Sequence, residues 1–131
     1  MKLDTKELKN ITLLYVEDDQ LIREQTNKIL TKLFKKVFCA YDGKNGLEIF
    51  KEYQNEIDVI VTDINMPHLN GLEMIEEINK LQNSIPTIVT TAHTDSNYLI
   101  NAIDLNVDKY IAKPIQIKDL TISVVDNVPK I

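Results

Sequence analysis

Short apolar runs alternate along the chain with longer amphipathic segments. The short runs are of strand length and mostly rich in Ile and Val, and they cover residues 11–16, 36–40, 57–62, 86–91 and 107–112. They lack the strict alternation of apolar and polar residues that marks a half-exposed strand. The pattern therefore predicts five β-strands that are buried on both faces.

The longer segments carry apolar residues at helical spacing. In the first of them the apolar stripe comprises Ile22, Ile29, Leu30, Leu33 and Phe34. Four of the segments follow a residue that commonly caps a helix N-terminus, and a fifth begins at Ile115. The expected N-caps are Asp19, Asp42, Asn70 and Thr94.

Strand and helix thus alternate about five times, which is typical of the α/β class. We expect a doubly wound, five-stranded parallel sheet with five helices over both faces and right-handed crossovers. The length of 131 residues matches one domain, and 44% hydrophobic with 27% charged residues is an ordinary globular composition. The expected domain is 1–131, with a core from about 11 to 127 and an N-terminal extension over 1–10.

The net charge of −5 argues against a nucleic-acid-binding surface, because neutralising phosphates needs a basic patch. The lone cysteine, Cys39, lies in an apolar run and is expected to be a small buried hydrophobe rather than a reactive thiol. The sequence shows neither a signal peptide nor an apolar stretch near the roughly 20 residues of a membrane helix. These features predict a cytoplasmic protein without membrane contact.

Polar residues stand where four of the predicted strands end. The carboxyl ends of parallel strands lie along one edge of the sheet, which is where ligands bind in such folds. At this edge we expect Glu17 and Asp18 from the first strand, Asp63 from the third, Thr91 from the fourth and Lys113 from the fifth.

Clustered carboxylates repel one another, by roughly 1–4 kcal/mol for a pair about 4 Å apart. A cluster of Glu17, Asp18 and Asp63 would therefore take up protons or bind a cation, and Mg²⁺ is a natural choice for oxygen ligands. Asp19 is expected to cap the following helix. The alternative for Glu17 and Asp18 is that they too only stabilise this helix end.

With a cation beside it, the carboxylate of Asp63 is a candidate nucleophile toward phosphorus, which would give an aspartyl phosphate. Lys113 and the Thr91 hydroxyl could then contact the transferred group. Taken singly, an Asp after a strand is usually a turn residue, and a Lys at a strand end is usually a solvated charge. Pro114 restricts the conformation of Lys113 and permits a cis bond between them.

Five segments in order resemble the receiver domains of response regulators, the phosphoacceptor family of two-component signalling. They are LLYVEDDQLIR, AYDGKNGLEIF, DVIVTDINMPHLNGLEMI, PTIVTTAH and KYIAKP. The resemblance spans about residues 11–127. It implies the flavodoxin-like strand order 2-1-3-4-5.

The resemblance also implies a role for each residue at the sheet edge. Glu17 and Asp18 match the acidic pair that binds Mg²⁺, for which Mn²⁺ could substitute, and Asp63 matches the phosphorylated aspartate. The backbone carbonyl of Asn65 matches the position that completes the metal site. Lys113 matches the lysine that pairs with the phosphoryl group, and the peptide bond after it matches a cis bond.

A switch follows from the same resemblance. Thr91 matches a hydroxyl residue that is drawn toward the phosphoryl group. Tyr110 matches an aromatic residue that turns inward when Thr91 moves. The packing of the fourth helix, the fifth strand and the fifth helix would change as a result. A Tyr110 that stays fixed in or near the core is the alternative. Asn65 and His93 match positions that tune dephosphorylation, although a surface histidine without a role is the alternative for His93.

Three features depart from the usual pattern of the family. Glu17 stands where Asp is commoner, residues 105–107 stand where Gly is frequent, and Ile115 stands where Phe is more usual. None of them removes a required group. The extra methylene of Glu17 is expected to change the geometry or affinity of the metal site.

The resemblance predicts a signalling switch rather than an enzyme, one that catalyses only its own phosphorylation and slow dephosphorylation. Its phosphodonor would be a sensor histidine kinase or a phosphotransfer protein. The output is open, since a domain beyond residue 131, a separate target protein and a phosphorylation-dependent homodimer all fit the sequence.

Other functions compete with this prediction. The main alternative is a degenerate receiver that serves as an interaction module without phosphorylation. A flavin-binding domain is disfavoured because no Ser/Thr/Gly-rich phosphate loop follows the first strand. A phosphatase with an Asp nucleophile is disfavoured because the acidic residues 17–19 are contiguous rather than a spaced Asp-x-Asp pair.

Overall fold

A computed structural model describes residues 5–64, 70–81, 85–91 and 107–128 of the chain. The sheet consists of β1 (Thr12–Val16), β2 (Lys36–Ala40), β3 (Val59–Asp63), β4 (Thr87–Thr91) and β5 (Lys109–Ala112). All neighbouring strands are parallel, and their order is β2-β1-β3-β4-β5. This is the predicted flavodoxin-like order, so the fold class is confirmed.

Two strands, β3 and β5, begin two residues later than predicted, each directly after an aspartate. Oδ2 of Asp58, before β3, accepts a hydrogen bond from the backbone N–H of Thr12 at 2.8 Å. Oδ2 of Asp108, before β5, accepts one from the N–H of Thr87 at 2.7 Å. Each carboxylate thus satisfies the first backbone donor of the neighbouring strand.

The two outer strands differ from the three inner ones in burial. All residues of β1, β3 and β4 are buried, whereas β2 and β5 are buried only in part. The prediction of strands buried on both faces is wrong for β2 and β5, because a strand at the edge of a sheet has one neighbour only. Cys39 in β2 is accordingly half-buried rather than buried, and this burial raises the pKa of its thiol.

Five helices lie in the described part of the chain. They are α1 (Thr5–Leu8), α2 (Gln20–Leu33), α3 (Gly43–Tyr53), α4 (Gly71–Leu81) and α6 (Ile117–Asn127). Three of the predicted N-caps are confirmed, since side chains of Asp19, Asp42 and Asn70 accept backbone N–H bonds at 3.0, 2.7 and 2.9 Å. The helix expected after Thr94 falls outside the described residues. No described helix is long and apolar enough to span a membrane.

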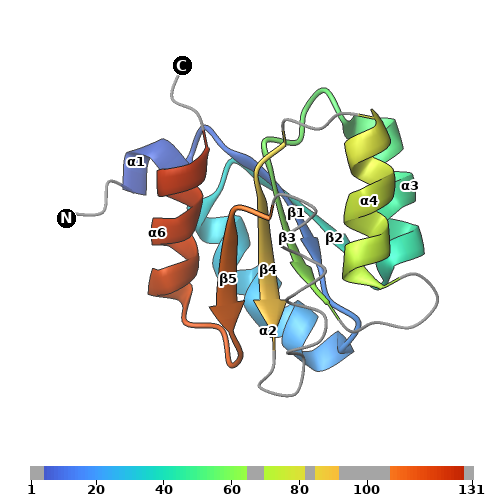
Figure 1. Ribbon diagram of the computed structural model, residues 1–131. Coiled ribbons are helices and arrows are strands. Elements are labelled where there is room, and N and C mark those ends of the chain that lie inside the picture. Colours follow the sequence, from blue (N-terminus) through green and yellow to red (C-terminus); the bar gives the residue numbers. More distant parts are fainter. Residues whose placement is uncertain (1–4, 65–69, 82–84, 92–106, 129–131) are drawn as a thin grey trace.

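The helices cover the sheet on both faces (Figure 1). Residues of α1, α2 and α6 pack in one cluster with alternate residues of β1 and β3, and residues of α3 and α4 pack against the other face. The expected N-terminal extension contributes to the first cluster, because Leu8 of α1 is fully buried. Neither its four-residue helix nor its charged neighbours gave a periodic signal in the sequence.

The predicted apolar stripe of α2 is wrong at two positions. Ile22 and Ile29 are 40% and 44% exposed, while Leu30 and Phe34 are buried. Ile22 and Ile29 are seven residues apart, so they share a line about 100° away from Leu30 around the helix. Only the line through Leu30 faces the sheet.

Candidate functional site

Acidic side chains from two strands meet at the carboxyl edge of the sheet. Glu17 and Asp18 directly follow β1, and Asp63 is the last residue of β3. Carboxylate oxygens of the three residues all lie within 4.8 Å of one another. Glu17 and Asp63 are 1% and 5% exposed, whereas Asp18 is exposed. The predicted cluster therefore forms, with one of its members open to solvent.

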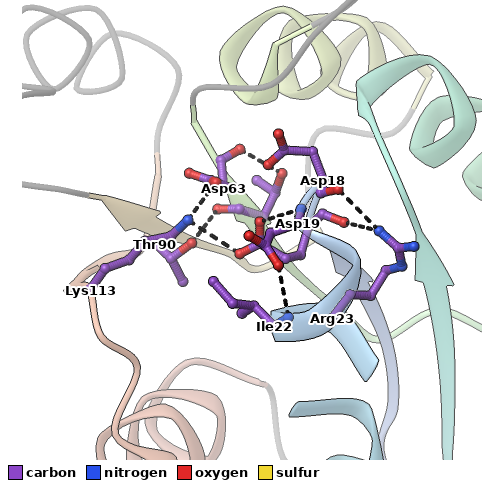
Figure 2. A network of polar contacts seen from close by, with 9 residues as sticks. Asp18, Asp19, Ile22, Arg23, Asp63, Thr90 and Lys113 are labelled. Atoms are coloured by element: carbon purple, nitrogen blue, oxygen red, sulfur yellow. Dashed lines mark hydrogen bonds and ion pairs between the residues drawn. The ribbon is translucent and has the colours of Figure 1, made fainter. Parts of the chain in front are cut away.

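Lys113 brings a positive charge into this cluster from the end of β5. Its Nζ lies 2.5 Å from Oδ2 of Asp63 and 3.2 Å from Oε1 of Glu17 (Figure 2). Burial disfavours the ammonium charge, but the hydrogen bond and charge of Asp63, with those of Glu17, outweigh it and raise the pKa of Lys113. The peptide bond between Lys113 and Pro114 is cis, as predicted.

Glu17 lies in an unusual electrostatic environment for a carboxylate. Burial raises its pKa, and the charge of Asp63 adds to this. The backbone N–H of Asp19, which donates to Oε2 of Glu17 at 3.1 Å, and the ammonium of Lys113 lower the pKa but do not outweigh burial. A further positive charge beside Glu17 would therefore stabilise its ionised form.

Close backbone packing fixes the position of Asp63. Gly71, at the start of α4, donates its N–H to the carbonyl oxygen of Ile64 at 2.8 Å. A Cβ on Gly71 would lie 2.1 Å from the carbonyl oxygen of Asp63. A residue without a side chain is required here, because the contact is made by backbone atoms that cannot swing aside.

The predicted switch residues lie on neighbouring strands. Thr91 ends β4 and is 7% exposed, and Tyr110 belongs to β5. The register pairs Tyr110 with Val89, two residues before Thr91. Tyr110 is half-buried against the cluster of Ile64, Leu72, Ile75 and Val89. Burial raises the pKa of its hydroxyl, which has no hydrogen-bond partner among the residues that the structure describes.

Two predicted residues cannot be placed in the site. Asn65 and His93 both lie outside the described residues. Arg23, by contrast, belongs to the site but was not predicted. Its Nη1 donates to the backbone carbonyl oxygens of Glu17, at 2.8 Å, and Asp18, at 3.4 Å. A basic residue one helical turn after the cap Asp19 is the only signal that could have pointed to it.

The donor set fits a hard divalent cation. All three acidic residues offer carboxylate oxygens, the ligands that Mg²⁺ prefers. Oε1 of Glu17 is buried, and the partner that the described residues offer it is the ammonium of Lys113, 3.2 Å away. A buried oxygen of this kind has coordination capacity left for a metal.

Comparison with known proteins gives the family. A flavodoxin-like sheet with this acidic cluster at its carboxyl edge defines a class of small α/β domains. The sequence profile of the response regulator receiver domain matches residues 13–125. The chain belongs to the response regulator receiver family, and it is a signalling module rather than a classical enzyme.

Individual relatives agree with this assignment. The response regulator ArlR of Staphylococcus haemolyticus is 34% identical over 108 residues, which are 82% of this chain and 48% of ArlR. The two-component response regulator ARR10 of Arabidopsis thaliana is 27% identical over 108 residues, 82% of this chain and 19% of ARR10. This chain thus spans about half or less of the length of these relatives.

Solved structures match most of the chain. A response regulator receiver domain protein of Clostridium thermocellum has a TM-score of 0.81 at 32% identity, covering 89% of this chain and 93% of that chain. The N-terminal domain of an uncharacterized Wolinella succinogenes protein has a TM-score of 0.82 at 37% identity, covering 88% and 92%. The similarity therefore extends over the whole fold.

Proposed function

We propose that this receiver domain accepts a phosphoryl group on Asp63 in a Mg²⁺-dependent reaction. The observation that carries the proposal is the bridge that Lys113 makes between Asp63 and Glu17, inside a group of three carboxylates within 4.8 Å. An ammonium and a divalent cation on either side of one carboxylate are what a phosphoryl acceptor requires, because the transferred oxygens carry negative charge. A degenerate receiver would need none of these groups.

The chemical step is a displacement at phosphorus. A carboxylate oxygen of Asp63 forms the new bond while the phosphorus–nitrogen bond of a donor phosphohistidine breaks. The imidazole leaves with the bonding electron pair and takes up a proton. Glu17, Asp18 and Asp63 would hold Mg²⁺, which would supply positive charge beside the transferring oxygens. The donor would belong to a sensor histidine kinase or a phosphotransfer protein, the partners that the family implies.

Each neighbouring side chain has a part in stabilising the product. Lys113 exchanges its contact with Asp63 for one with a phosphoryl oxygen, which its position at 2.5 Å from Oδ2 supports. Thr91, at the end of β4, donates its hydroxyl to another of these oxygens. Asn65 supplies a backbone carbonyl to the metal, and Asn65 and His93 set the rate of dephosphorylation.

Phosphorylation would then change the surface around β5. Movement of the Thr91 hydroxyl toward the phosphoryl group leaves space at the end of β4. Tyr110 can enter this space, since its hydroxyl has no hydrogen-bond partner among the described residues and its ring is only half-buried. The surface of β5 and α6 would carry the signal to an output domain, a target protein or a second copy of the chain.

Intact mass spectrometry tests the proposal. Incubation with acetyl phosphate and Mg²⁺ should add one phosphoryl group to the wild-type protein and none to Asp63→Asn. Asp119→Asn, at an exposed position of α6, is the matched control and should be phosphorylated normally. A wild-type protein that takes up no phosphoryl group, with its fold intact by circular dichroism, would establish the degenerate receiver instead.

A further inference from the structure

We infer that Arg23 is a positioning residue for the divalent metal site, and this inference rests on the proposed function. Arg23 is the fourth residue of α2 and points back toward the end of β1 (Figure 2). Its Nη1 donates to the carbonyl oxygen of Glu17 at 2.8 Å and to that of Asp18 at 3.4 Å. A single guanidinium nitrogen therefore contacts the backbone of both adjacent acidic residues.

The backbone at this point lies just past the hydrogen-bond ladder of the sheet. The pairing of β1 with its two neighbours ends at Val16. The N–H of Glu17 still donates to the carbonyl of Ala40 at 3.1 Å, but no backbone N–H among the described residues donates to the carbonyls of Glu17 and Asp18. Among the described residues, Arg23 supplies the hydrogen-bond donor to both carbonyls.

Holding the carbonyls also holds the carboxylates. Rotation of the peptide between Glu17 and Asp18 would change the direction in which both side chains leave the backbone. The carboxylate of Glu17 is fixed further by the N–H of Asp19 and by Lys113, but Asp18 is exposed. The described contacts of Asp18 are the guanidinium of Arg23 at its backbone carbonyl and the neighbouring side chain of Glu17, so Arg23 is the group that holds its backbone. A ligand held in place before the metal arrives loses less entropy on binding.

The positive charge of Arg23 acts on the metal in the opposite direction. A guanidinium beside an acidic cluster repels a second cation, so charge alone predicts that loss of Arg23 would tighten metal binding. Loss of the backbone contacts predicts weaker binding. The two effects differ in sign, so the direction in which the affinity changes shows which of them dominates.

The decisive experiment is a Mn²⁺ titration of the full chain, in which electron paramagnetic resonance counts the free ion. Arg23→Met removes both the donors and the charge while keeping a good helix former. We expect its dissociation constant for Mn²⁺ to rise about tenfold, the scale found when a group that supports metal ligands is lost. Arg23→Lys keeps the charge but replaces the planar guanidinium by a compact ammonium. Its affinity for Mn²⁺ should lie between those of the wild type and Arg23→Met.

Lys28→Met is the matched control. It removes one positive charge from the same helix, five residues further along, at an exposed position. Its Mn²⁺ affinity should stay within about twofold of the wild type, because charges this exposed are screened by salt. Competition by Mg²⁺ should give the same ranking of the variants.

A second measurement needs no metal. The amide N–H of Asp19 donates to Oε2 of Glu17, so its hydrogen-exchange rate reports how well this turn is held. We expect faster exchange at Asp19 in metal-free Arg23→Met than in the wild type, with the thermal unfolding temperature little changed. If Arg23→Met does not fold, the comparison of Arg23→Lys with the wild type takes its place.

Failure of this inference can be told from failure of the proposed function. A wild-type protein that binds no Mn²⁺, or binds it as well after Asp18→Asn, would show that the acidic cluster is not a metal site. A wild type that binds Mn²⁺ through Asp18, together with an Arg23→Met affinity that is equal or tighter, would overturn the role of Arg23 alone.

Discussion

The ammonium of Lys113 connects Asp63 to the end of another strand, because its Nζ lies 2.5 Å from Oδ2 of Asp63 and 3.2 Å from Oε1 of Glu17. One cation thus compensates two carboxylates that are almost fully buried. Removing one partner of a buried charge pair usually costs more than the pair contributes, since the other charge is left without compensation. Lys113 is therefore expected to matter both for phosphorylation and for the fold.

Lys113→Met should slow phosphorylation by acetyl phosphate about a hundredfold, the scale for losing one preorganised group that stabilises developing charge. The metal should still bind, since all three carboxylates remain and a competing cation is gone. Lys109→Met, at the exposed start of β5, is the control and should react at the wild-type rate. Equal rates for the Lys113 variant and the wild type, measured by intact mass against time, would contradict the assigned role.

The raised pKa of Lys113 predicts an alkaline limit to stability. A basic group whose pKa is higher in the folded state stabilises the fold fully below its ordinary value of 10.5, and this contribution is lost as the pH rises through the higher folded pKa. The urea midpoints of wild type and Lys113→Met, measured without divalent metal, should therefore differ by a constant amount from pH 8 to 10. The difference should shrink only above that range. A difference that stays constant well above pH 10.5, or that grows as the pH rises, would mean that the pKa is not raised.

Gly71→Ala tests the contact between α4 and the backbone of Asp63. The added Cβ would lie 2.1 Å from the carbonyl oxygen and 3.0 Å from the carbonyl carbon of Asp63, so α4 must shift. We expect a loss of about 1–3 kcal/mol in the free energy of unfolding, the range for overpacking, and slower phosphorylation of the displaced Asp63. Urea unfolding with the acetyl phosphate assay measures both.

Gly46→Ala is the informative comparison for this prediction. Its Cβ would approach Sδ of Met74 to 2.6 Å, but that atom belongs to a flexible side chain that can move. Replacing a glycine inside a helix by alanine also stabilises the helix by up to about 1 kcal/mol. Gly46→Ala should thus be the milder variant and should leave phosphorylation unchanged. The reverse ranking would show that the backbone contact at Gly71 is not the limiting one.

Much of the fold could be predicted because burial and capping leave signals in the sequence. The inner strands are continuous apolar runs, and Asp19, Asp42 and Asn70 each cap a helix through a side chain typical of that position. Exposure around α2 could not be predicted in the same way. In the sequence, the isoleucines at 22 and 29 cannot be told from isoleucines that are buried in the core. Only the packed structure shows that Ile22 and Ile29 lie on the side of the helix that faces solvent.

In the candidate site, too, some residues could be predicted from the sequence and others could not. Four site residues could be predicted because each lies at the carboxyl end of a strand and carries its chemistry in its side chain. They are Glu17, Asp18, Asp63 and Lys113. Arg23 could not, since it acts on backbone carbonyls, which every residue has and which therefore leave no pattern in the sequence. The contact of Gly71 with Asp63 is of the same kind, backbone against backbone.

The two aspartates that precede β3 and β5 form matched clamps at the opposite edge of the sheet. Asp58 accepts the N–H of Thr12 at 2.8 Å and donates its own N–H to the carbonyl of Thr12 at 2.9 Å. Asp108 makes the same pair of contacts with Thr87, at 2.7 and 2.9 Å. A variant such as Asp58→Ala leaves the threonine N–H without its acceptor. The loss should be about 1.5–3 kcal/mol, typical for a hydrogen bond to a charged group.

Asp58→Ala, Asp108→Ala and the double variant should show additive losses in urea unfolding, because the two clamps join different pairs of strands and share no partner. Asp126→Ala, at an exposed position of α6, is the control and should change stability by less than about 0.5 kcal/mol. Phosphorylation by acetyl phosphate should stay at the wild-type rate in all of them, since the clamps lie at the edge away from Asp63. If the double variant loses much less stability than the sum of the two single variants, the two clamps act on one cooperative strand rearrangement. If a single variant loses no more stability than Asp126→Ala, water replaces the carboxylate at little cost.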